Sequence, residues 1–192
     1  MVCGEADNAA DTLRLLPESQ ADLALVDISL PGNSGIDLIR DIQTLKPGFP
    51  IVVFSMHDET LYGERALRAG ARGYVMKQDS PDRLLEAIRT VLAGHVFVGE
   101  NLKDSLLSSI IVTNDHKRIG VERLSNRELQ VFEHIGRGLS TAEIAAQLNL
   151  SPKTVETYRA HIKRKLGLKD GNHLLQAAIR WEESDYSGPT NQ

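Results

Sequence analysis

Two helix start signals lie eleven residues apart in the C-terminal part of the chain. Ser140 is followed by Glu143, the spacing of a capping box, and Ser151 is followed by Pro152, which suits a first helical turn because its missing N–H needs no partner there. Between them, Asn149 suits a left-handed turn position. Two short helices joined by a tight turn fit this spacing, so the stretch is expected to fold as a helix-turn-helix.

The second of these helices has an apolar face and a basic face. Apolar residues recur at steps of three and four, which predicts a buried stripe made of Val155, Tyr158, Ile162 and Leu166. From Ser151 to Lys169 there are six Lys or Arg and one acidic residue, although the whole chain carries a net charge of -4. A basic helix face is often only solvated surface. Here it follows a helix-turn-helix start, which favours DNA binding.

The segment from Leu124 to Trp181 resembles the LuxR-type DNA-binding domain through LSNRELQVFEHIGRGLSTAEIAAQLNLSPKTVETYRAHIKRKLG. The resemblance implies a homodimer on double-stranded DNA. It also implies that base edges in the major groove face Glu156, Thr157 and Ala160, and that phosphates are held by Lys153, Thr154, Arg159 and Lys163. The side-chain chemistry agrees, because a carboxylate accepts from cytosine N4, methyl groups pack on thymine, and cations hold the backbone.

Charge is unevenly divided along the 192 residues. Residues 1–100 hold nine basic and fifteen acidic side chains, whereas residues 122–181 hold ten basic and six acidic ones. Opposite signs in the two halves indicate two domains with separate tasks.

Composition excludes several protein classes. The chain is 41% hydrophobic and 25% charged, and its single cysteine, Cys3, allows neither an internal disulfide nor a cysteine-based metal site. We find no apolar run long enough to span a membrane and no secretory leader, so a cytoplasmic protein without a membrane partner is expected. The six histidines are scattered without metal-ligand spacing, and none is assigned to catalysis.

Residues 1–98 alternate short apolar runs with amphipathic segments, the pattern of a parallel sheet flanked by helices. We expect strands at Leu23–Val26, Ile51–Phe54 and Gly73–Met76, and helices at Ala9–Leu16, Gly35–Leu45, Glu59–Ala69 and Pro81–Ala93. The predicted fold class is α/β with a second, smaller all-α helix-turn-helix domain. That domain should span residues 122–186, after a linker at 99–121 with a short helix possible at Leu102–Ile111, and before a disordered tail at 187–192. Its last helix, Asn172–Trp181, should carry Leu174, Leu175, Ala178 and Trp181 on a common side.

Each predicted strand ends at a polar side chain: Asp27, Ser55 or Lys77. Function gathers at the carboxyl ends of the strands in open parallel sheets, so these three side chains are expected to lie together. A carboxylate nucleophile, a hydroxyl that contacts a phosphoryl oxygen and an ammonium that neutralises charge make a phosphoryl-transfer site. A phosphatase of the haloacid-dehalogenase type is disfavoured, because it needs a second Asp two residues on, where this chain has Ser29.

The motifs LALVDISLPGNSG, IVVFSM and GYVMK resemble the flavodoxin-like receiver domain of two-component response regulators, and with the C-terminal domain they resemble the NarL/FixJ family. The resemblance implies Asp27 as phospho-acceptor and partial Mg²⁺ ligand, Ser55 as switch hydroxyl, Tyr74 as switch aromatic and Lys77 as charge partner. It implies a sensor histidine kinase as partner and a regulator, not an enzyme. Tyr74 fits equally well as a half-buried strand aromatic.

Turn residues follow the acceptor: Pro31 and Gly35 are expected to shape the loop after Asp27.

Receiver domains of this family begin with an apolar strand, which ends in the adjacent carboxylates that hold Mg²⁺ and is followed by a helix. No such strand and helix precede Val2 in this sequence. Residues from Val2 onward look like the second strand. In the strand order 2-1-3-4-5, the absent strand lies between the second and third, so the edge of Leu23–Val26 should be unpaired or find a new partner. Two alternatives stay open. Either an upstream segment of about 25 to 35 residues completes the domain, or an incomplete receiver leaves DNA binding independent of phosphorylation.

Overall fold

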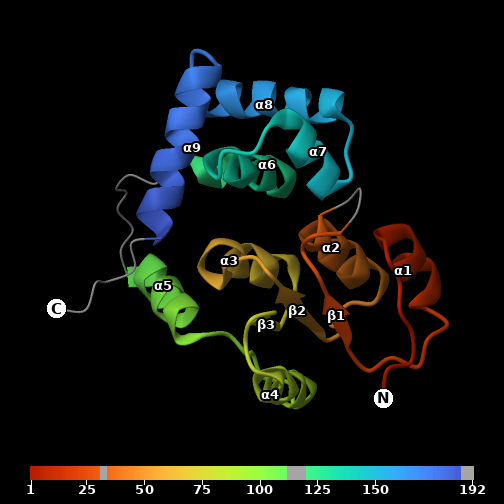
Figure 1. Ribbon diagram of the computed structural model, residues 1–192. Coiled ribbons are helices and arrows are strands. Elements are labelled where there is room, and N and C mark those ends of the chain that lie inside the picture. Colours follow the sequence, from red (N-terminus) through yellow and green to blue (C-terminus); the bar gives the residue numbers. More distant parts are fainter. Residues whose placement is uncertain (31–33, 112–119, 187–192) are drawn as a thin grey trace. The chain divides into compact units, whose positions relative to one another are not determined.

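The computed structural model describes residues 1–30, 34–111 and 120–186, in two compact units, Met1–Asp115 and His116–Gln192 (Figure 1). Each unit is considered by itself. Pro31 and the expected disordered tail at 187–192 lie outside the described residues.

Unit 1 is built on a parallel sheet of strands β1 (Ala24–Val26), β2 (Ile51–Ser55) and β3 (Gly73–Met76), in the order β1-β2-β3. The predicted strands are confirmed to within one residue at each end. Residues 1–8 form no strand, so the expected second strand of the receiver pattern is not formed.

Four helices follow the predicted pattern: α1 (Ala9–Leu15), α2 (Gly35–Leu45), α3 (Glu59–Ala69) and α4 (Pro81–Leu92). Each begins after a side chain that accepts a hydrogen bond from the first turn, namely Asn8, Ser34, Asp58 and Ser80. Helices α2 and α3 lie on one side of the sheet and α4 on the other (Figure 1). Under α4, Val52 and Val75 of the sheet pack with Ala87 and Val91.

Helix α5 (Glu100–Ile111) occupies the first half of the expected linker and packs on α3. Leu102 is buried there, and a Cβ added to Gly63 of α3 would lie 2.3 Å from its Cδ2 atom. A side chain at position 63 would therefore have to displace the buried Leu102 side chain. Residues 112–119 lie outside the described residues.

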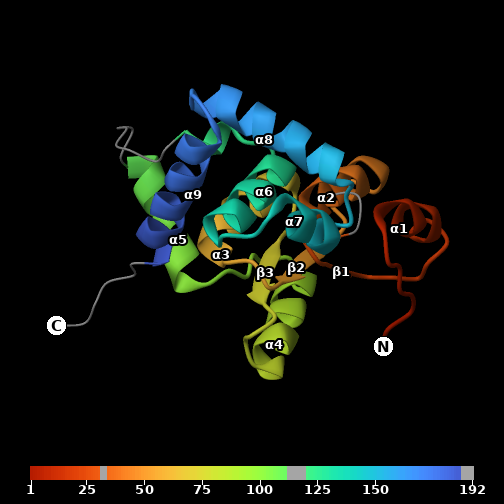
Figure 2. The same cartoon turned by 45° about the horizontal axis from the view of Figure 1, so that its top comes forward.

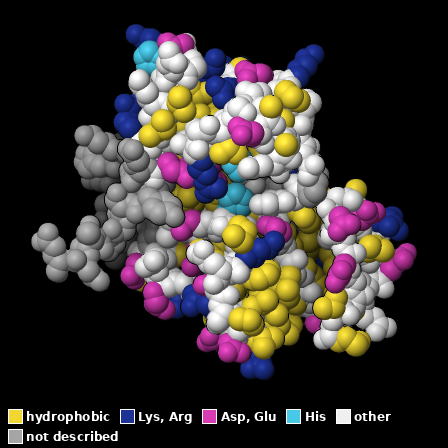
Figure 3. Space-filling view, in the orientation of Figure 1, with side chains coloured by type: hydrophobic (Ala, Val, Ile, Leu, Met, Phe, Trp, Pro, Cys, Tyr) yellow, Lys and Arg dark blue, Asp and Glu magenta, His cyan; other side chains and the backbone are white. Residues whose placement is uncertain are grey.

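One side of unit 1 exposes apolar side chains. Strand β1 pairs with β2 alone among the described strands, and its Leu25 is 47% exposed. On α4, Leu85 and Leu92 are 47% and 50% exposed. Figure 3 shows apolar side chains gathered in its lower middle part, where Figure 1 places α4 and the sheet. The expectation of a β1 edge without a second partner is thus met within the described chain.

Unit 2 is all-helical. A 3₁₀ turn η1 (Val121–Arg123) precedes helices α6 (Asn126–Gly136), α7 (Thr141–Leu148), α8 (Pro152–Leu166) and α9 (Gly171–Tyr186). Figures 1 and 2 both show α8 along one side of the unit, with α6 and α7 beside it. The rings of Phe132 and Trp181 lie 5.6 Å apart and join α6 to α9.

The start signals and the turn are confirmed. Ser140 and Glu143 form a capping box, Ser151 caps α8 with Pro152 in the first turn, and Asn149 takes the left-handed conformation with φ +51°. The α7–α8 connection is therefore the predicted helix-turn-helix.

The apolar stripes are confirmed in part. On α8, Val155 and Ile162 are fully buried, while Tyr158 and Leu166 are half-buried. On α9, Leu174, Ala178 and Trp181 are buried, but Leu175 is 39% exposed, so its assignment to the common side was wrong. Ala177 is buried in its place, because the buried stripe of α9 follows steps of three and four from Leu174 and not the adjacent position.

In the described ranges of the chain we find no helix long and apolar enough to cross a membrane.

The first prediction concerns Gly35, whose N–H donates to the carbonyl of Ile28 at 3.0 Å. A Cβ at this position would lie 2.0 Å from the carbonyl oxygen of Asp27, a separation that backbone atoms must move to relieve. We expect Gly35→Ala to destabilise unit 1 by roughly 1–3 kcal/mol. Amide hydrogen exchange of β1 should speed up. Gly4→Ala, with open space around the added methyl, is the control and should leave the exchange unchanged.

The second prediction concerns Glu128, which accepts from the Ser125 N–H at 2.7 Å and from the Lys165 ammonium at 2.5 Å. Burial raises the pKa of Glu128, but the hydrogen bonds from Lys165 and Ser125 outweigh it and hold the pKa below its usual value. Glu128→Gln should lower the free energy of unfolding by roughly 1–3 kcal/mol.

The sign with pH follows from the lowered pKa of Glu128. Glu128 makes its full contribution to the free energy of unfolding above the unfolded-state pKa of about 4.3. This contribution disappears as the pH falls through the lower pKa of the folded state. Urea unfolding followed by Trp181 fluorescence should show a gap between the two proteins at pH 7 that narrows in acid. The exposed Glu122→Gln serves as control. If the difference in the free energy of unfolding stays constant down to pH 3, the loss of stability in Glu128→Gln comes from altered packing and not from the charge of Glu128.

Candidate functional site

The carboxyl ends of the three strands bring together Asp27, Ser55 and Lys77. Asp27 follows β1, Ser55 ends β2, and Lys77 follows β3. The Lys77 ammonium donates to Asp27 Oδ2 at 2.7 Å, and the Ser29 N–H donates to Asp27 Oδ1 at 2.9 Å. The side chain of Asp27 is still 27% exposed, so a reactant can reach its carboxylate.

The charge state of Asp27 suits a nucleophile. Burial raises the pKa of this carboxyl, but hydrogen bonds from the Lys77 ammonium, the Ser29 N–H and the Ser55 hydroxyl together hold the pKa below its usual value. Asp27 is therefore ionised at neutral pH, with the Lys77 ammonium beside it to balance further negative charge.

Tyr74 reaches this site through His57. The Tyr74 hydroxyl donates to the His57 carbonyl at 2.9 Å, and the His57 N–H donates to Ser55 Oγ at 3.3 Å. The His57 ring in turn lies 2.9 Å from Ser29 Oγ through Nε2. Tyr74 is 1% exposed, so it is a buried aromatic with a bonded hydroxyl and not a half-buried one.

No role was predicted for His57 from the sequence. In the structure His57 contacts Ser29, Ser55 and Tyr74. One signal for it exists: His57 follows Ser55 by two residues, as Ser29 follows Asp27 by two. Both residues come within three positions of the carboxyl ends of neighbouring parallel strands, which places them at the same sheet edge.

The site offers little to a divalent cation. The groups that contact Asp27 are an ammonium, a hydroxyl and an N–H, none of which adds negative charge. Over the parts of the chain that the structure describes, no group of three His, Cys, Asp or Glu side chains is placed to hold a metal. Mg²⁺ prefers six oxygen ligands in octahedral geometry, and Asp27 supplies only part of that shell. The residues present do not by themselves fit the implied Mg²⁺ site.

The second candidate site is the outer face of α8. Beyond Pro152, the exposed residues of this helix recur at steps of three and four and form one stripe: Lys153, Glu156, Thr157, Ala160 and Arg164. The three residues predicted to face bases all lie on this stripe. Lys153 is exposed with them, whereas Thr154, Arg159 and Lys163 are only partly exposed. The sequence pattern places Arg164 on this face, two helical turns after Thr157, but Arg164 was not among the residues expected to contact DNA.

Glu156 is held in place by neighbouring side chains. The Thr141 hydroxyl, at the start of α7, donates to Glu156 Oε1 at 2.7 Å, and Arg159 Nε lies 3.6 Å from the same oxygen. The second carboxylate oxygen stays available on the exposed stripe. Helix α7 thus fixes the orientation of a side chain on α8.

Comparison with known protein families agrees with this division into two sites. Residues 1–89 match the response regulator receiver domain, and residues 122–178 match the bacterial regulatory proteins of the luxR family.

Relatives match along nearly the whole chain. The transcriptional regulatory protein UhpA of Escherichia coli is 35% identical over 175 residues, which covers 91% of this chain and 83% of the relative. The oxygen regulatory protein NreC of Staphylococcus carnosus is 33% identical over 192 residues, which covers 94% of this chain and 87% of the relative.

A solved structure also matches most of the chain. RcsB from Salmonella enterica serovar Typhimurium, bound to promoter rprA in the presence of phosphomimetic BeF3-, aligns with a TM-score of 0.55 at 28% identity, over 93% of this chain and 85% of that one. With a receiver site on the sheet, a LuxR-type helix-turn-helix and relatives of this similarity, the chain belongs to the DNA-binding response regulators of two-component systems, which control transcription.

Proposed function

We propose that Asp27 receives a phosphoryl group and that this modification controls how α8 binds DNA. The observation that carries the proposal is the ionised Asp27 carboxylate at the carboxyl ends of three adjacent parallel strands, 2.7 Å from the Lys77 ammonium. The donor is a sensor histidine kinase, as the family membership implies.

The chain's own residues have distinct roles in this transfer. An Asp27 carboxylate oxygen attacks the phosphorus, the bond from phosphorus to the donor nitrogen breaks, and the leaving imidazole keeps that electron pair. Lys77 balances the charge on the transferring group, and the Ser55 hydroxyl donates to one of its oxygens. The His57 N–H donates to Ser55 Oγ and the Tyr74 hydroxyl donates to the His57 carbonyl, so a movement of Ser55 can reach Tyr74 through the His57 backbone.

Receiver domains typically bind Mg²⁺ for this chemistry. In this chain the described residues provide Asp27 as a partial ligand, so we derive no step from the metal.

For DNA binding we propose the outer face of α8. Glu156, Thr157 and Ala160 face base edges, and phosphates are held by Lys153, Thr154, Arg159 and Lys163. Two copies bind together on double-stranded DNA. The chain acts in the cytoplasm as a regulator and not as an enzyme, with a receiver domain at 1–98 and a DNA-binding domain at 122–186.

A second candidate function is DNA binding without phosphorylation control. Two observations favour it: among the described residues, no second carboxylate contacts that of Asp27, and β1 exposes Leu25 at an edge for which the described strands offer no partner besides β2. Phosphorylation of the chain separates the two candidates.

The third prediction is that acetyl phosphate or a kinase adds one phosphoryl group to the 192-residue chain, as measured by intact mass. Asp27→Asn should abolish the added mass, because the carboxylate nucleophile is lost. Asp22→Asn, on the exposed loop before β1, should retain it. Modification should also change the affinity for DNA. A wild-type chain that stays unmodified yet binds DNA would establish the second candidate, and phosphate on another residue would refute the assignment of Asp27.

The fourth prediction contrasts two exposed residues of α8. Lys153→Ala should weaken binding to every duplex alike and reduce the salt slope by about one unit, because one phosphate contact is lost. Glu156→Ala should relax the preference for one base pair, at a cost of about 1–3 kcal/mol. Binding is measured against a panel of duplexes at several salt concentrations, with Lys103→Ala in unit 1 as control. A uniform loss from Glu156→Ala would mean that this side chain supports the fold.

A further inference from the structure

We infer that Arg164 and Arg123 bind phosphates of the DNA backbone at the C-terminal end of α8, so that the DNA interface extends beyond the helix-turn-helix. The inference deepens the DNA-binding role proposed for α8 and rests on it.

Arg164 continues the exposed stripe of α8 into the last turn. It follows Ala160 by four residues and Thr157 by seven, and its side chain is exposed. Several other cations of unit 2 are engaged within the unit: Arg137 with Glu133 and Glu182, Arg159 with Glu156, and Lys165 with Glu128. No ion pair engages Arg164 or Arg123 within the described residues, so both guanidinium groups can bind an external anion.

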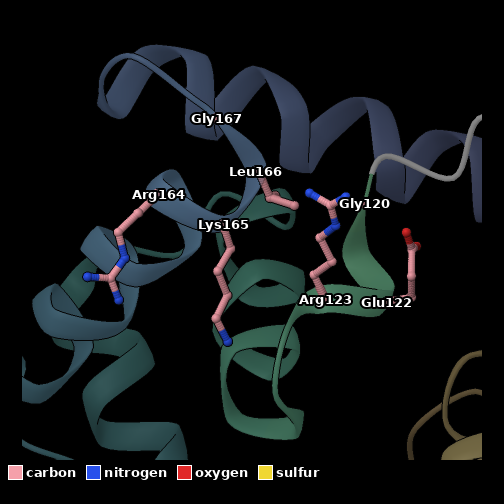
Figure 4. A pocket seen from close by; sticks show the side chains of 7 residues that line it. All are labelled: Gly120, Glu122, Arg123, Arg164, Lys165, Leu166 and Gly167. Atoms are coloured by element: carbon pink, nitrogen blue, oxygen red, sulfur yellow. The ribbon is translucent and has the colours of Figure 1, made fainter.

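Arg164 and Arg123 line one open depression of about 520 Å³, shown in Figure 4. Its other lining residues come from the same two segments: Gly120, Glu122, Lys165, Leu166 and Gly167. Arg123 belongs to η1, which packs on α8 ahead of the first helix of the domain. The depression thus joins a turn outside the helix-turn-helix to the end of its second helix.

The two guanidinium groups are spread along this depression and do not converge. In Figure 4 the Arg123 side chain extends toward Leu166, and Arg164 lies on the far side of Lys165. A compact anion would need several donors around one point. Cations set out in a row fit a linear polyanion with regularly spaced charges, which is the chemistry of a nucleic-acid backbone.

Local negative charge does not cancel this pair. In Figure 4 the Glu122 side chain runs alongside that of Arg123, and no ion pair joins the two within the described residues. The Lys165 ammonium donates a hydrogen bond to the Glu128 carboxylate at 2.5 Å, so its charge is balanced within the unit. The remaining positive charge of the depression is on the two arginines. At the helix end, the Lys163 carbonyl accepts from the Leu168 N–H at 2.8 Å, which satisfies a group that would otherwise repel an anion.

Position on the helix favours phosphate over base contact. In helix-turn-helix proteins the N-terminal residues of the recognition helix read base edges. Residues in the last turn of α8, and the turn that packs beside it, then lie further along the interface, where the backbone of the duplex borders the groove. Arginine suits this place because its planar fork binds phosphate through two parallel hydrogen bonds.

The test, which is the fifth prediction, measures binding of the full 192-residue chain to a random-sequence DNA duplex over a series of salt concentrations. Arg123→Gln and Arg164→Gln keep the aliphatic stem and remove the charge. Each should lower the salt slope by about 0.9 and the affinity roughly five- to tenfold at 0.1 M salt, with both effects adding in the double variant. Arg180→Gln, which changes another exposed cation of unit 2, on α9, is the matched control and should keep the wild-type slope.

Further measurements distinguish a failure of this inference from a failure of the proposed role of α8. Lysine at either position should restore the slope, and Trp181 fluorescence should confirm that each variant is folded. Duplexes selected by the wild-type chain from a random pool should lose affinity by the same factor as the random duplex. Unchanged slopes in the glutamine variants, while Lys153→Ala lowers the slope, would overturn this inference alone. A changed base preference in Arg164→Gln would overturn the phosphate assignment. A wild-type chain without salt-dependent DNA binding would end both this inference and the proposed role of α8.

Discussion

The ion pair between Asp27 and Lys77 links residues that follow the two outer described strands of the sheet, with β2 between them. The registers Val26 with Val53 and Val53 with Tyr74 bring the carboxyl ends of the strands to one edge of the sheet, and there the Lys77 side chain reaches Asp27 across β2 with an oxygen–nitrogen distance of 2.7 Å. Gly35 allows the chain to return close to the Asp27 carbonyl. The Asp27 carboxylate and its counter-charge thus depend on one packing arrangement.

Much of this arrangement could be predicted from residue patterns, for identifiable reasons. Helix starts such as Ser140 and Ser151 were found because a cap is a local interaction between near neighbours. Strand ends were found because buried parallel strands read as apolar runs. Gly35 was expected to be a turn residue, but the structure shows that it is needed for a close approach to another segment, which the sequence does not display.

The contacts that were missed depend on tertiary structure. The bonds of His57 to Ser55 and Tyr74 use its backbone, so its residue type gives no sign of them. The exposure of Leu175 depends on where α9 meets α6, and a periodicity of 3.6 residues does not fix that direction to within one position. The engagement of Glu128 by Lys165 likewise links α6 to α8, over a separation of 37 residues. Such pairs determine which cations of unit 2 remain available to DNA, and composition alone does not identify them.

The hydrogen bond from Thr141 to Glu156 has a consequence for how DNA preference evolves. In the proposed DNA interface, the base contact of Glu156 depends on Thr141, the side chain that orients its carboxylate. An exchange of Glu156 for a residue of another length or charge leaves Thr141 without its acceptor, and an exchange of Thr141 frees the carboxylate to turn. Substitutions at positions 141 and 156 are therefore expected to be coupled in their effect on DNA preference.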